Sequence, residues 1–277
     1  MTFRLANLDG LAALVDPDDG LHPLGISALE ALADEDALHS RSAGLDPTSP
    51  TISLEVAAES GRLGAPVPTP RSVFAVGLNY RTHAAESGMD LPKTPLVFTK
   101  FPSCIVGPRH DVVLDAALGD YEVELVVVIG RGGRHIPAHE AWGRVAGLTV
   151  GQDISDRALQ FAAQPPHFDL GKSRDTYGPT GPVVVSIDSF ADPDDLELSC
   201  WVNGEQRQHD RTSNLIFGVP HLIEYLSSIL TLSTGDLIFT GTPDGVGAAS
   251  QRFLAPGDVI TSEIEGIGTI VNRCVER

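Results

Sequence analysis

The stretch Asp120-Tyr121-Glu122-Val123-Glu124-Leu125-Val126-Val127-Val128-Ile129 (DYEVELVVVI) carries the strongest structural signal in the chain. Its last part, Leu125–Ile129, is apolar at every position, which predicts a strand that is buried on both faces. Residues two apart in a strand share a face, so the side chains of Glu122 and Glu124 are expected to point the same way.

Two adjacent carboxylates on a buried strand are unfavourable, because burial and like-charge repulsion both oppose ionisation. A divalent cation removes this cost, and Mg²⁺, Mn²⁺ and Ca²⁺ all prefer oxygen ligands. The alternative is that the strand begins at the surface and both glutamates are solvated. Asp153 closes the next apolar segment and is the best candidate for a third carboxylate ligand. The alternative for Asp153 is an ordinary aspartate at the entry to a helix.

Short apolar segments separated by turn residues lie on both sides of this strand. Asn203-Gly204 is suited to the left-handed turn that joins two strands of a hairpin. The expected strands are Ser72–Leu78, Leu96–Lys100, Tyr121–Ile129, Val183–Ile187, Leu196–Val202, Leu237–Thr240, Val259–Ile264 and Gly266–Cys274. Many short strands with scattered helices predict a β-rich α+β fold.

Two helices are expected among these strands. The apolar residues between Val219 and Leu230 recur on one helical face, with Pro220 in the first turn. A second, short helix is expected over Asp156–Ala163, where Ser155 could act as the cap. Strands and helices do not alternate along the chain, which argues against a parallel Rossmann sheet.

A proline-rich segment divides the chain. Pro66, Pro68 and Pro70 stand at alternate positions, and proline fixes φ and removes an N–H donor. We therefore expect a small, partly helical N-terminal domain with its linker over residues 1–68. A catalytic domain is expected over residues 69–277.

Composition excludes several classes of function. The chain has 277 residues, 42% of them hydrophobic, and a formal net charge of −18, which argues against binding to nucleic acid. No stretch approaches about 18 uncharged apolar residues, so no membrane span is expected. The N-terminus does not read as a secretion signal, and three cysteines without CxxC spacing fit a cytoplasmic protein without a zinc site.

Basic residues are few, and three of them lie close together in sequence. Lys172, Arg174 and Arg157 form a local cationic island that could hold an anionic substrate, or could be a surface loop. Arg157 and Gln160 share one side of the expected short helix, and both suit a carboxylate ligand. The alternative for this pair is a solvated helix face.

Two further segments carry candidate chemistry. His83 and Glu86 are neighbours on a helical turn, where a carboxylate can orient a histidine that activates water. Taken alone, this HxxE pattern also fits two surface residues. The glycine-rich loop that begins at Thr240 is neither a P-loop nor a dinucleotide-binding turn. Its backbone N–H groups and threonine hydroxyls could meet a carboxylate.

Taken together, these segments resemble the fumarylacetoacetate hydrolase family. The matching pieces occur in the family's order over residues 72–275. They are AVGLNYRTHAAESG, PLVFTKFPSCIVGP, DYEVELVVVIGRGGR, VAGLTVGQDISDRALQ, GKSRDTYGPTGPVV, VNGEQRQ, LIFTGTPDGVG and LAPGDVITSEIEGIGTIVNRC.

The resemblance implies a mixed β-roll catalytic domain behind a small N-terminal domain, commonly in a homodimer. It implies Mg²⁺ or Mn²⁺, with Ca²⁺ as a surrogate, on Glu122, Glu124 and Asp153. The catalytic residues it implies are Lys172 and the dyad His83 and Glu86 on a mobile lid. The residues expected to bind substrate are Tyr80, Arg157, Gln160, Thr240, Gly241 and Thr242.

The family's substrates are small 2-oxo or 2,4-dioxo acids. The resemblance implies a metal-dependent hydrolase that cleaves a C–C bond of an acylpyruvate or fumarylpyruvate through a pyruvate enolate. The alternatives are oxaloacetate decarboxylation, isomerisation of 2-hydroxyhepta-2,4-diene-1,7-dioate, decarboxylation of 5-oxopent-3-ene-1,2,5-tricarboxylate in aromatic catabolism, and a non-catalytic metal-bound binding protein.

Three departures from the family pattern affect these expectations. Gln152 stands where the family often has asparagine, and Ala158 stands where it often has aspartate, which could loosen the orientation of Arg157. The segment Phe161–Leu170 is less typical and leaves the substrate open.

Overall fold

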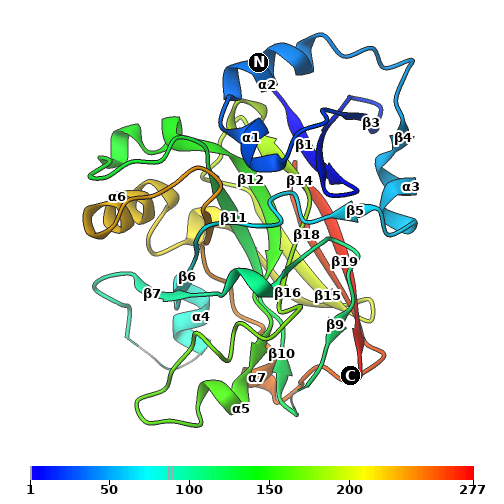
Figure 1. The fold of residues 1–277 in the computed structure, drawn as a ribbon. Coiled ribbons are helices and arrows are strands. Elements are labelled where there is room, and N and C mark those ends of the chain that lie inside the picture. The colour runs from blue at the N-terminus through cyan, green and yellow to red at the C-terminus, as the bar shows by residue number, and fades with distance from the viewer. Residues whose placement is uncertain (1, 87, 89, 116) are drawn as a thin grey trace.

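A computed structural model describes residues 2–86, 88, 90–115 and 117–277. Ser87, in the segment matched to the family, lies outside the described residues. Within the described chain, a 12-stranded sheet, a 5-stranded sheet and a 2-stranded ribbon make up the β structure (Figure 1). The main path of the large sheet runs β4-β3-β2-β1-β14-β12-β11-β17-β6-β7, and the 5-stranded sheet runs β16-β15-β18-β19-β9. The β-rich fold predicted from the sequence is confirmed.

The strands of the large sheet and the ribbon are mostly short. They are β1 Arg4–Leu8, β2 Leu11–Val15, β3 Gly20–Pro23, β4 Ile52–Ser53, β5 Leu63–Gly64, β6 Val73–Gly77, β7 Leu96–Thr99, β8 Ile105–Val106, β10 Gly119–Asp120, β11 Val123–Ile129, β12 Val145–Gln152, β13 Ser155–Asp156, β14 Gly178–Ser186 and β17 Leu237–Phe239. Those of the 5-stranded sheet are β9 Val112–Val113, β15 Glu197–Val202, β16 Glu205–Arg211, β18 Val259–Ile264 and β19 Gly268–Val275.

The helices lie outside these sheets. The α-helices are α1 Ala28–Leu32, α2 Glu35–Ala43, α3 Leu54–Glu59, α4 Arg81–Glu86, α5 Arg157–Gln160, α6 Val219–Ile229 and α7 Gly247–Ser250. The 3₁₀ turns are η1 Pro102–Cys104, η2 Ala138–Glu140, η3 Trp142–Arg144, η4 Ile187–Ser189 and η5 Thr212–Asn214. Helices α4, α5 and α7 lie at one end of the molecule, far from α1 and α2 (Figure 1).

The centre of the large sheet is fully buried. Every residue of β11, β12 and β14 is buried, as the apolar run of β11 predicted. Strand β11 pairs antiparallel with β12 on one side and with β17 on the other. The register of these two ladders fixes the positions of the candidate site residues.

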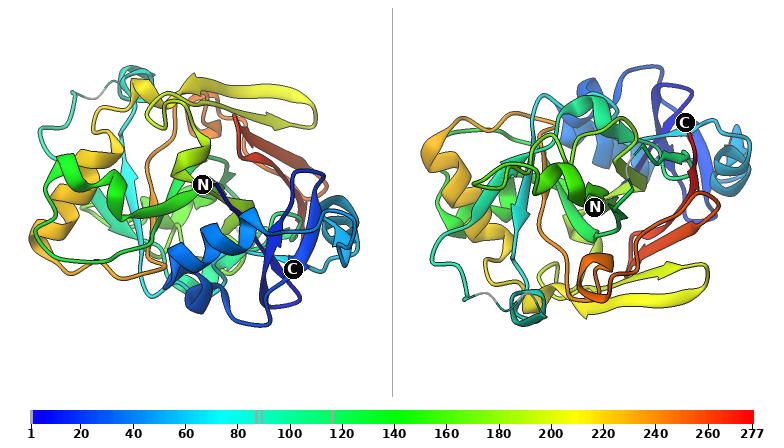
Figure 2. Two further views of the ribbon diagram at one scale, coloured as in Figure 1. Left: turned by 90° about the horizontal axis from the view of Figure 1, so that it is seen from above. Right: turned by 90° about the horizontal axis from the view of Figure 1, so that it is seen from below.

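The hairpin predicted at Asn203-Gly204 joins β15 to β16. Both turn residues have positive φ, at 53° and 78°. Asparagine and glycine tolerate that conformation, which explains why this pair turns the chain here. The hairpin lies beside β18 and β19, on the opposite side of the molecule from α6 (Figure 2).

The N-terminal segment combines strands with short helices. Helix α1 begins with a capping box, in which Ser27 and Glu30 each accept a backbone N–H of the other. Strand β1 pairs with β14 at Leu5↔Val184, so the N-terminal strands extend the large sheet. The domain boundary at residue 68 stays a prediction.

The short helix differs from its prediction. Strand β13 ends at Asp156, and this residue caps α5 by accepting the N–H of Leu159. Ser155 instead donates its hydroxyl to the carbonyl of Asp153. The predicted cap was therefore one residue early, and the helix is one turn long.

None of the helices in the described part of the chain is both long enough and apolar enough to cross a membrane.

Candidate metal and active site

Three carboxylates converge where β11 and β12 meet. Val123 pairs with Gln152, so Glu122 and Asp153 face each other just beyond the paired residues. The backbone N–H of Asp153 donates to the carbonyl of Glu122 at 2.9 Å. Glu124 lies two residues along the same strand, and one oxygen from each of the three carboxylates lies within 4.8 Å of the others. The predicted cluster therefore forms, although Glu122 precedes the strand instead of lying within it.

The two buried glutamates of this cluster have pKa values shifted in opposite directions. Burial and the charges of Asp153 and Glu122 raise the pKa of Glu124 well above its usual value. Burial also acts to raise the pKa of Glu122, but Lys172 and Arg157 outweigh it and lower that pKa to about 2. Exposed fractions of 6%, 1% and 0% for Glu122, Glu124 and Asp153 exclude the solvated alternative.

Two buried lysines contact the cluster. The ammonium of Lys172 donates to Oε2 of Glu122 and to Oδ2 of Asp153, each at 2.7 Å. Lys100, which directly follows β7, donates to Oδ1 of Asp153 at 2.6 Å. Both carboxylate oxygens of Asp153 are thus held by lysines.

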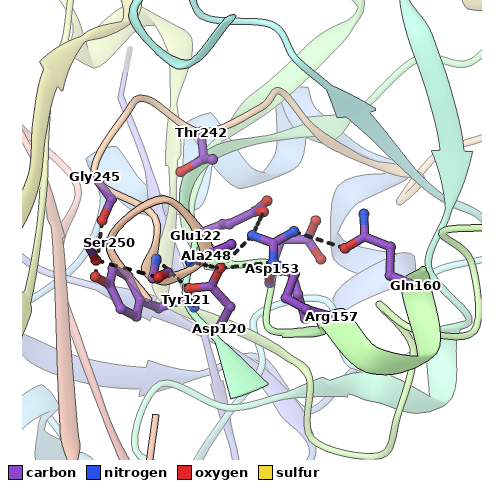
Figure 3. Close-up of polar contacts among 12 residues, drawn as sticks. Asp120, Tyr121, Glu122, Asp153, Arg157, Gln160, Thr242, Gly245, Ala248 and Ser250 are labelled. Atoms are coloured by element: carbon purple, nitrogen blue, oxygen red, sulfur yellow. Dashed lines mark hydrogen bonds and ion pairs between the residues drawn. The ribbon is translucent and has the colours of Figure 1, made fainter. Parts of the chain in front are cut away.

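Arg157 is held by protein groups on three sides (Figure 3). Its Nε donates to Oδ2 of Asp120 at 2.8 Å, one Nη to Oε1 of Glu122 at 2.6 Å, and the other Nη to Oε1 of Gln160 at 3.0 Å. Burial opposes the charge of Arg157, but Glu122 and Asp120 raise its pKa above the usual value. Asp120 therefore fixes the guanidinium despite the alanine at position 158.

Asp120 is also the anchor of the loop that precedes α7. Its carboxylate accepts the N–H groups of Gly247 at 2.6 Å and Ala248 at 3.0 Å. It also accepts the N–H of Tyr121 at 2.9 Å. This completely buried side chain therefore joins the start of α7 to Arg157 and so to the carboxylate cluster.

The loop after β17 faces Glu124. The β11–β17 register brings Gly241 opposite Glu124, and its N–H donates to Oε2 of Glu124 at 2.7 Å. Gly241 has φ +105°, and a Cβ there would lie 2.8 Å from Cβ of Asn79, so a side chain does not fit. Thr240 and Thr242 donate their hydroxyls to the carbonyls of Leu125 and Val123 at 2.9 and 2.8 Å. These donors, expected to meet a substrate carboxylate, are bonded to the protein here.

The histidine dyad lies near the same cluster. Nδ1 of His83 lies 3.4 Å from Oε2 of Glu86, and Oε1 of Glu86 accepts the N–H of Gly245 at 3.1 Å. The charge of His83 contributes to lowering the pKa of Glu122, after burial, Lys172 and Arg157. Helix α4 thus places His83 close enough to Glu122 for its charge to act on that carboxylate.

Tyr80, immediately before α4, has a completely buried ring. Among the described residues its hydroxyl has no hydrogen-bond partner. Burial and the charges of Asp210 and Glu124 raise its pKa well above the usual value. A neutral donor without a protein acceptor therefore remains in the vicinity of Glu124 and can serve a ligand.

Sequence reasoning assigned no role to Lys100, Asp120 or Gln208. Gln208 of β16 accepts the N–H of Val123 and donates to Oγ1 of Thr242, so it joins the two sheets beside the cluster. One signal could have revealed Lys100. The chain has three lysines against sixteen arginines, and Lys100 ends an apolar strand. Because arginine is the common basic residue of this chain, a lysine at the end of an apolar strand indicates a specific contact.

Comparison with known protein families identifies the family of this chain. The family model described as Fumarylacetoacetate (FAA) hydrolase C-terminal matches residues 72–275. The chain belongs to the fumarylacetoacetate hydrolase family. The resemblance inferred from the ordered segments is therefore confirmed.

Named relatives and solved structures are similar to this chain over most of its length. Oxaloacetate tautomerase FAHD2A, mitochondrial, of Homo sapiens is 45% identical over 215 residues, which are 76% of this chain and 68% of that protein. A putative HpcE protein from Mycobacterium smegmatis is 46% identical, with a TM-score of 0.90 over 99% of both chains. Maleylpyruvate hydrolase from Sphingobium sp. SYK-6, solved with manganese(II) and pyruvate, is 26% identical, with a TM-score of 0.78 over 99% of both chains. The fold and the family are those of enzymes, and this chain is accordingly an enzyme.

Proposed function

We propose that this enzyme interconverts the keto and enol forms of a small 2-oxo dicarboxylic acid such as oxaloacetate, with a divalent cation held by Glu122, Glu124 and Asp153. The observation that carries the proposal is the convergence of three buried carboxylates, with the Lys172 ammonium against two of them. Its reaction class is supported by the 45% identity to a protein named as an oxaloacetate tautomerase.

The donor set fits a hard divalent cation. Carboxylate oxygens are the ligands that Mg²⁺ and Mn²⁺ prefer. Within the described part of the chain, Glu124 has no cationic side chain in direct contact, unlike Glu122 and Asp153. Counting Asp120 with the cluster, four carboxylates lie beside Lys100, Lys172 and Arg157, which leaves one negative charge when all four are ionised. A divalent cation changes that to one positive charge, which suits an anionic substrate. When bound, the cation supplies Lewis acidity that favours an enolate over the keto form.

The chain's own residues complete the site. Lys172 and the unpartnered hydroxyl of Tyr80 can donate to the oxygen on which negative charge develops. His83, oriented by Glu86, takes the proton from C3. Delivery of one proton to the 2-oxygen completes the enol, so the overall reaction neither gains nor loses a proton. Arg157, Gln160, Thr240, Gly241 and Thr242 lie around the carboxylate cluster, and we propose that they contact the substrate.

Cleavage of a C–C bond in an acylpyruvate or fumarylpyruvate is the second candidate. The His83–Glu86 dyad favours it, because a histidine beside a carboxylate can take a proton from attacking water. The similarity to maleylpyruvate hydrolase supports this candidate as well. Both candidates require the same cation, the same enolate and the same Lys172.

One set of assays separates these reactions. The metal-loaded protein would be given enol-oxaloacetate, acetylpyruvate and fumarylpyruvate, with the ultraviolet absorbance of the enol and the release of pyruvate followed in parallel. Loss of the enol signal without pyruvate supports tautomerisation, and pyruvate from an acylpyruvate supports hydrolysis. Pyruvate from oxaloacetate identifies decarboxylation.

The matched variants are His83→Ala and His135→Ala, since His135 is an accessible histidine of a distant loop between β11 and η2. His83→Ala is expected to lower turnover about 100-fold or more, and His135→Ala to leave it unchanged. Bound metal with no turnover of any of these acids contradicts the proposal and favours the isomerase of 2-hydroxyhepta-2,4-diene-1,7-dioate or a binding protein.

We also propose the homodimer that the family resemblance implies. Phe161 and Leu170 are 56% and 58% exposed in the segment after α5, and Phe101 is 46% exposed. Where such exposed apolar side chains form a contiguous patch, they often mark a protein interface. Sedimentation at micromolar concentration tests this proposal directly.

A further inference from the structure

Lys100 is a completely buried lysine for which the proposed chemistry has no direct use. It follows β7, and its backbone N–H continues the sheet by donating to the carbonyl of Val73 at 3.0 Å. The sheet therefore fixes the backbone from which this side chain extends toward the carboxylate cluster. Burying an ammonium is costly unless all its hydrogens are bonded.

The three N–H donors of Lys100 have three protein acceptors. They are Oδ1 of Asp153 at 2.6 Å, the backbone carbonyl of Tyr177 at 3.0 Å, and the backbone carbonyl of Lys172. No donor remains for a substrate, so Lys100 acts through other residues.

Two of these acceptors belong to the site. Lys172 donates to Oδ2 of Asp153 and also to Glu122, whereas Lys100 holds Oδ1, the other oxygen of the same carboxylate. The second acceptor is the main-chain carbonyl of Lys172 itself. One ammonium thus holds both the third carboxylate and the loop that carries the site's other lysine.

We propose that Lys100 is a positioning residue that sets the orientation of the Asp153 carboxylate and the place of Lys172 in the metal site. The inference rests on the proposed function, because it assumes that Asp153 is a metal ligand. Groups that hold a ligand from behind typically contribute 10–100-fold to metal affinity or activity.

The test measures Mn²⁺ binding by calorimetry to the full chain stripped with a chelator. Lys100→Met keeps the length of the side chain and removes its charge and donors. The matched control is Lys93→Met, which removes the same charge from an exposed position. Lys100→Met is expected to weaken Mn²⁺ binding 10–100-fold with a folded circular-dichroism spectrum, and Lys93→Met to stay within twofold of the unmodified chain.

The other outcomes overturn the inference in distinct ways. Unchanged Mn²⁺ affinity in folded Lys100→Met makes Lys100 merely structural. Tighter binding means that its charge only opposed the cation, as simple repulsion predicts. Absence of Mn²⁺ binding to the unmodified chain instead contradicts the proposed function, and the inference fails with it.

A measurement on the unmodified chain decides the question if Lys100→Met does not fold. Amine acylation is followed residue by residue with mass spectrometry, with and without Mn²⁺. A positioning role predicts that Mn²⁺ slows acylation of Lys100 and Lys172 several-fold while Lys93 is unaffected. Equal rates for Lys100 in both conditions contradict the role.

Discussion

At the scale of single residues, the protein disfavours the charged form of Glu124. Its carboxylate is buried beside Glu122 and Asp153, and its direct hydrogen bond comes from an uncharged donor, the N–H of Gly241. A negative charge in this position destabilises the fold unless a cation is bound. Folding without a cation therefore favours a neutral side chain at position 124, whereas metal binding requires the charged carboxylate.

The substitution Glu124→Gln tests this conflict. In chelator-treated protein the variant should be more stable by about 0.5–2 kcal/mol, the usual size of a stabilising substitution. Mn²⁺ at 100 times its Kd should stabilise the unmodified protein by about 2.7 kcal/mol and the variant hardly at all. Thermal melts with and without Mn²⁺ measure both effects. Glu59→Gln, at an exposed position, is the control, and a variant that is less stable without metal contradicts this account.

The hydroxyl of Tyr80 offers a second test at this scale. It is buried and has no hydrogen-bond partner among the residues that the structure describes, so Tyr80→Phe should leave the free energy of unfolding unchanged or raise it by up to about 1 kcal/mol. A hydrogen bond to a charged oxygen of the substrate should disappear, and kcat/KM should fall about 10–100-fold. Urea unfolding and steady-state kinetics together check the prediction. A loss of stability with normal kinetics would mean that the hydroxyl has a structural partner.

The three clustered carboxylates could be predicted from the sequence, because they stand on two segments that local patterns identify. Glu122 and Glu124 lie two apart beside an apolar run, and Asp153 ends the segment that pairs with it. Lys100 and Gln208 could not be predicted in the same way, because their contacts join segments far apart in the chain. Their partners depend on how two sheets pack, which no local pattern encodes.

At the scale of elements, the contacts of Asp120 connect three pieces of backbone. Ribbon strand β10 ends at Asp120, and its side chain reaches both α5, through Arg157, and the first N–H groups of α7. The orientation of Arg157 thus depends on a residue 37 positions earlier in the chain.

We expect Asp120→Asn to destabilise the protein by about 3–5 kcal/mol, because Arg157 then keeps its buried charge without this partner. Denaturant unfolding measures the change. Asp115→Asn is the matched control, since the partner of Asp115 is the exposed Arg277 and a surface ion pair contributes about 0–1 kcal/mol. Equal losses in the two variants would contradict the anchoring role of Asp120.

Element boundaries show what local signals can specify. The hairpin at Asn203-Gly204 follows from the turn residues alone. Asp9-Gly10, between β1 and β2, also has positive φ at both residues, 54° and 88°, and carries the same signal. The pairing of β1 with β2 could therefore have been predicted in addition to the N-terminal helices. The extent of α5 could not, because the segment after Gln160 has no helical periodicity that would mark where the helix ends.

At the scale of the whole molecule, the N-terminal segment rests against the large sheet at α2. Glu35, in the first turn of α2, packs so closely on Gly130 that a Cβ there would clash with its Oε1. Glu35 also lines a cavity of about 540 Å³ with His39 and Trp142. Among the described residues, this Oε1 has no hydrogen-bond partner, and burial raises the pKa of Glu35 despite the opposing charge of Arg131.

This raised pKa predicts a pH-dependent stability. An acid whose pKa is higher in the folded state favours folding below its unfolded pKa, and this contribution is lost as pH rises through the folded value. Glu35→Gln should therefore stabilise the protein at neutral pH, by about 1 kcal/mol or less for a half-buried group, and the difference should vanish in mild acid. Thermal melts across this pH range check it. A variant that is less stable at neutral pH would indicate an undetected partner for Glu35.

The paired register of β11 and β12 restricts insertions and deletions in these two strands. Side chains alternate between faces, so an inserted or deleted codon within Val123–Ile129 or Val145–Gln152 would turn one carboxylate away from the other two. The connection from Gly130 to Arg144 carries no such restriction, because it returns the chain without entering the ladder. Alignment gaps among homologous sequences are therefore expected in that connection and not in the two strands.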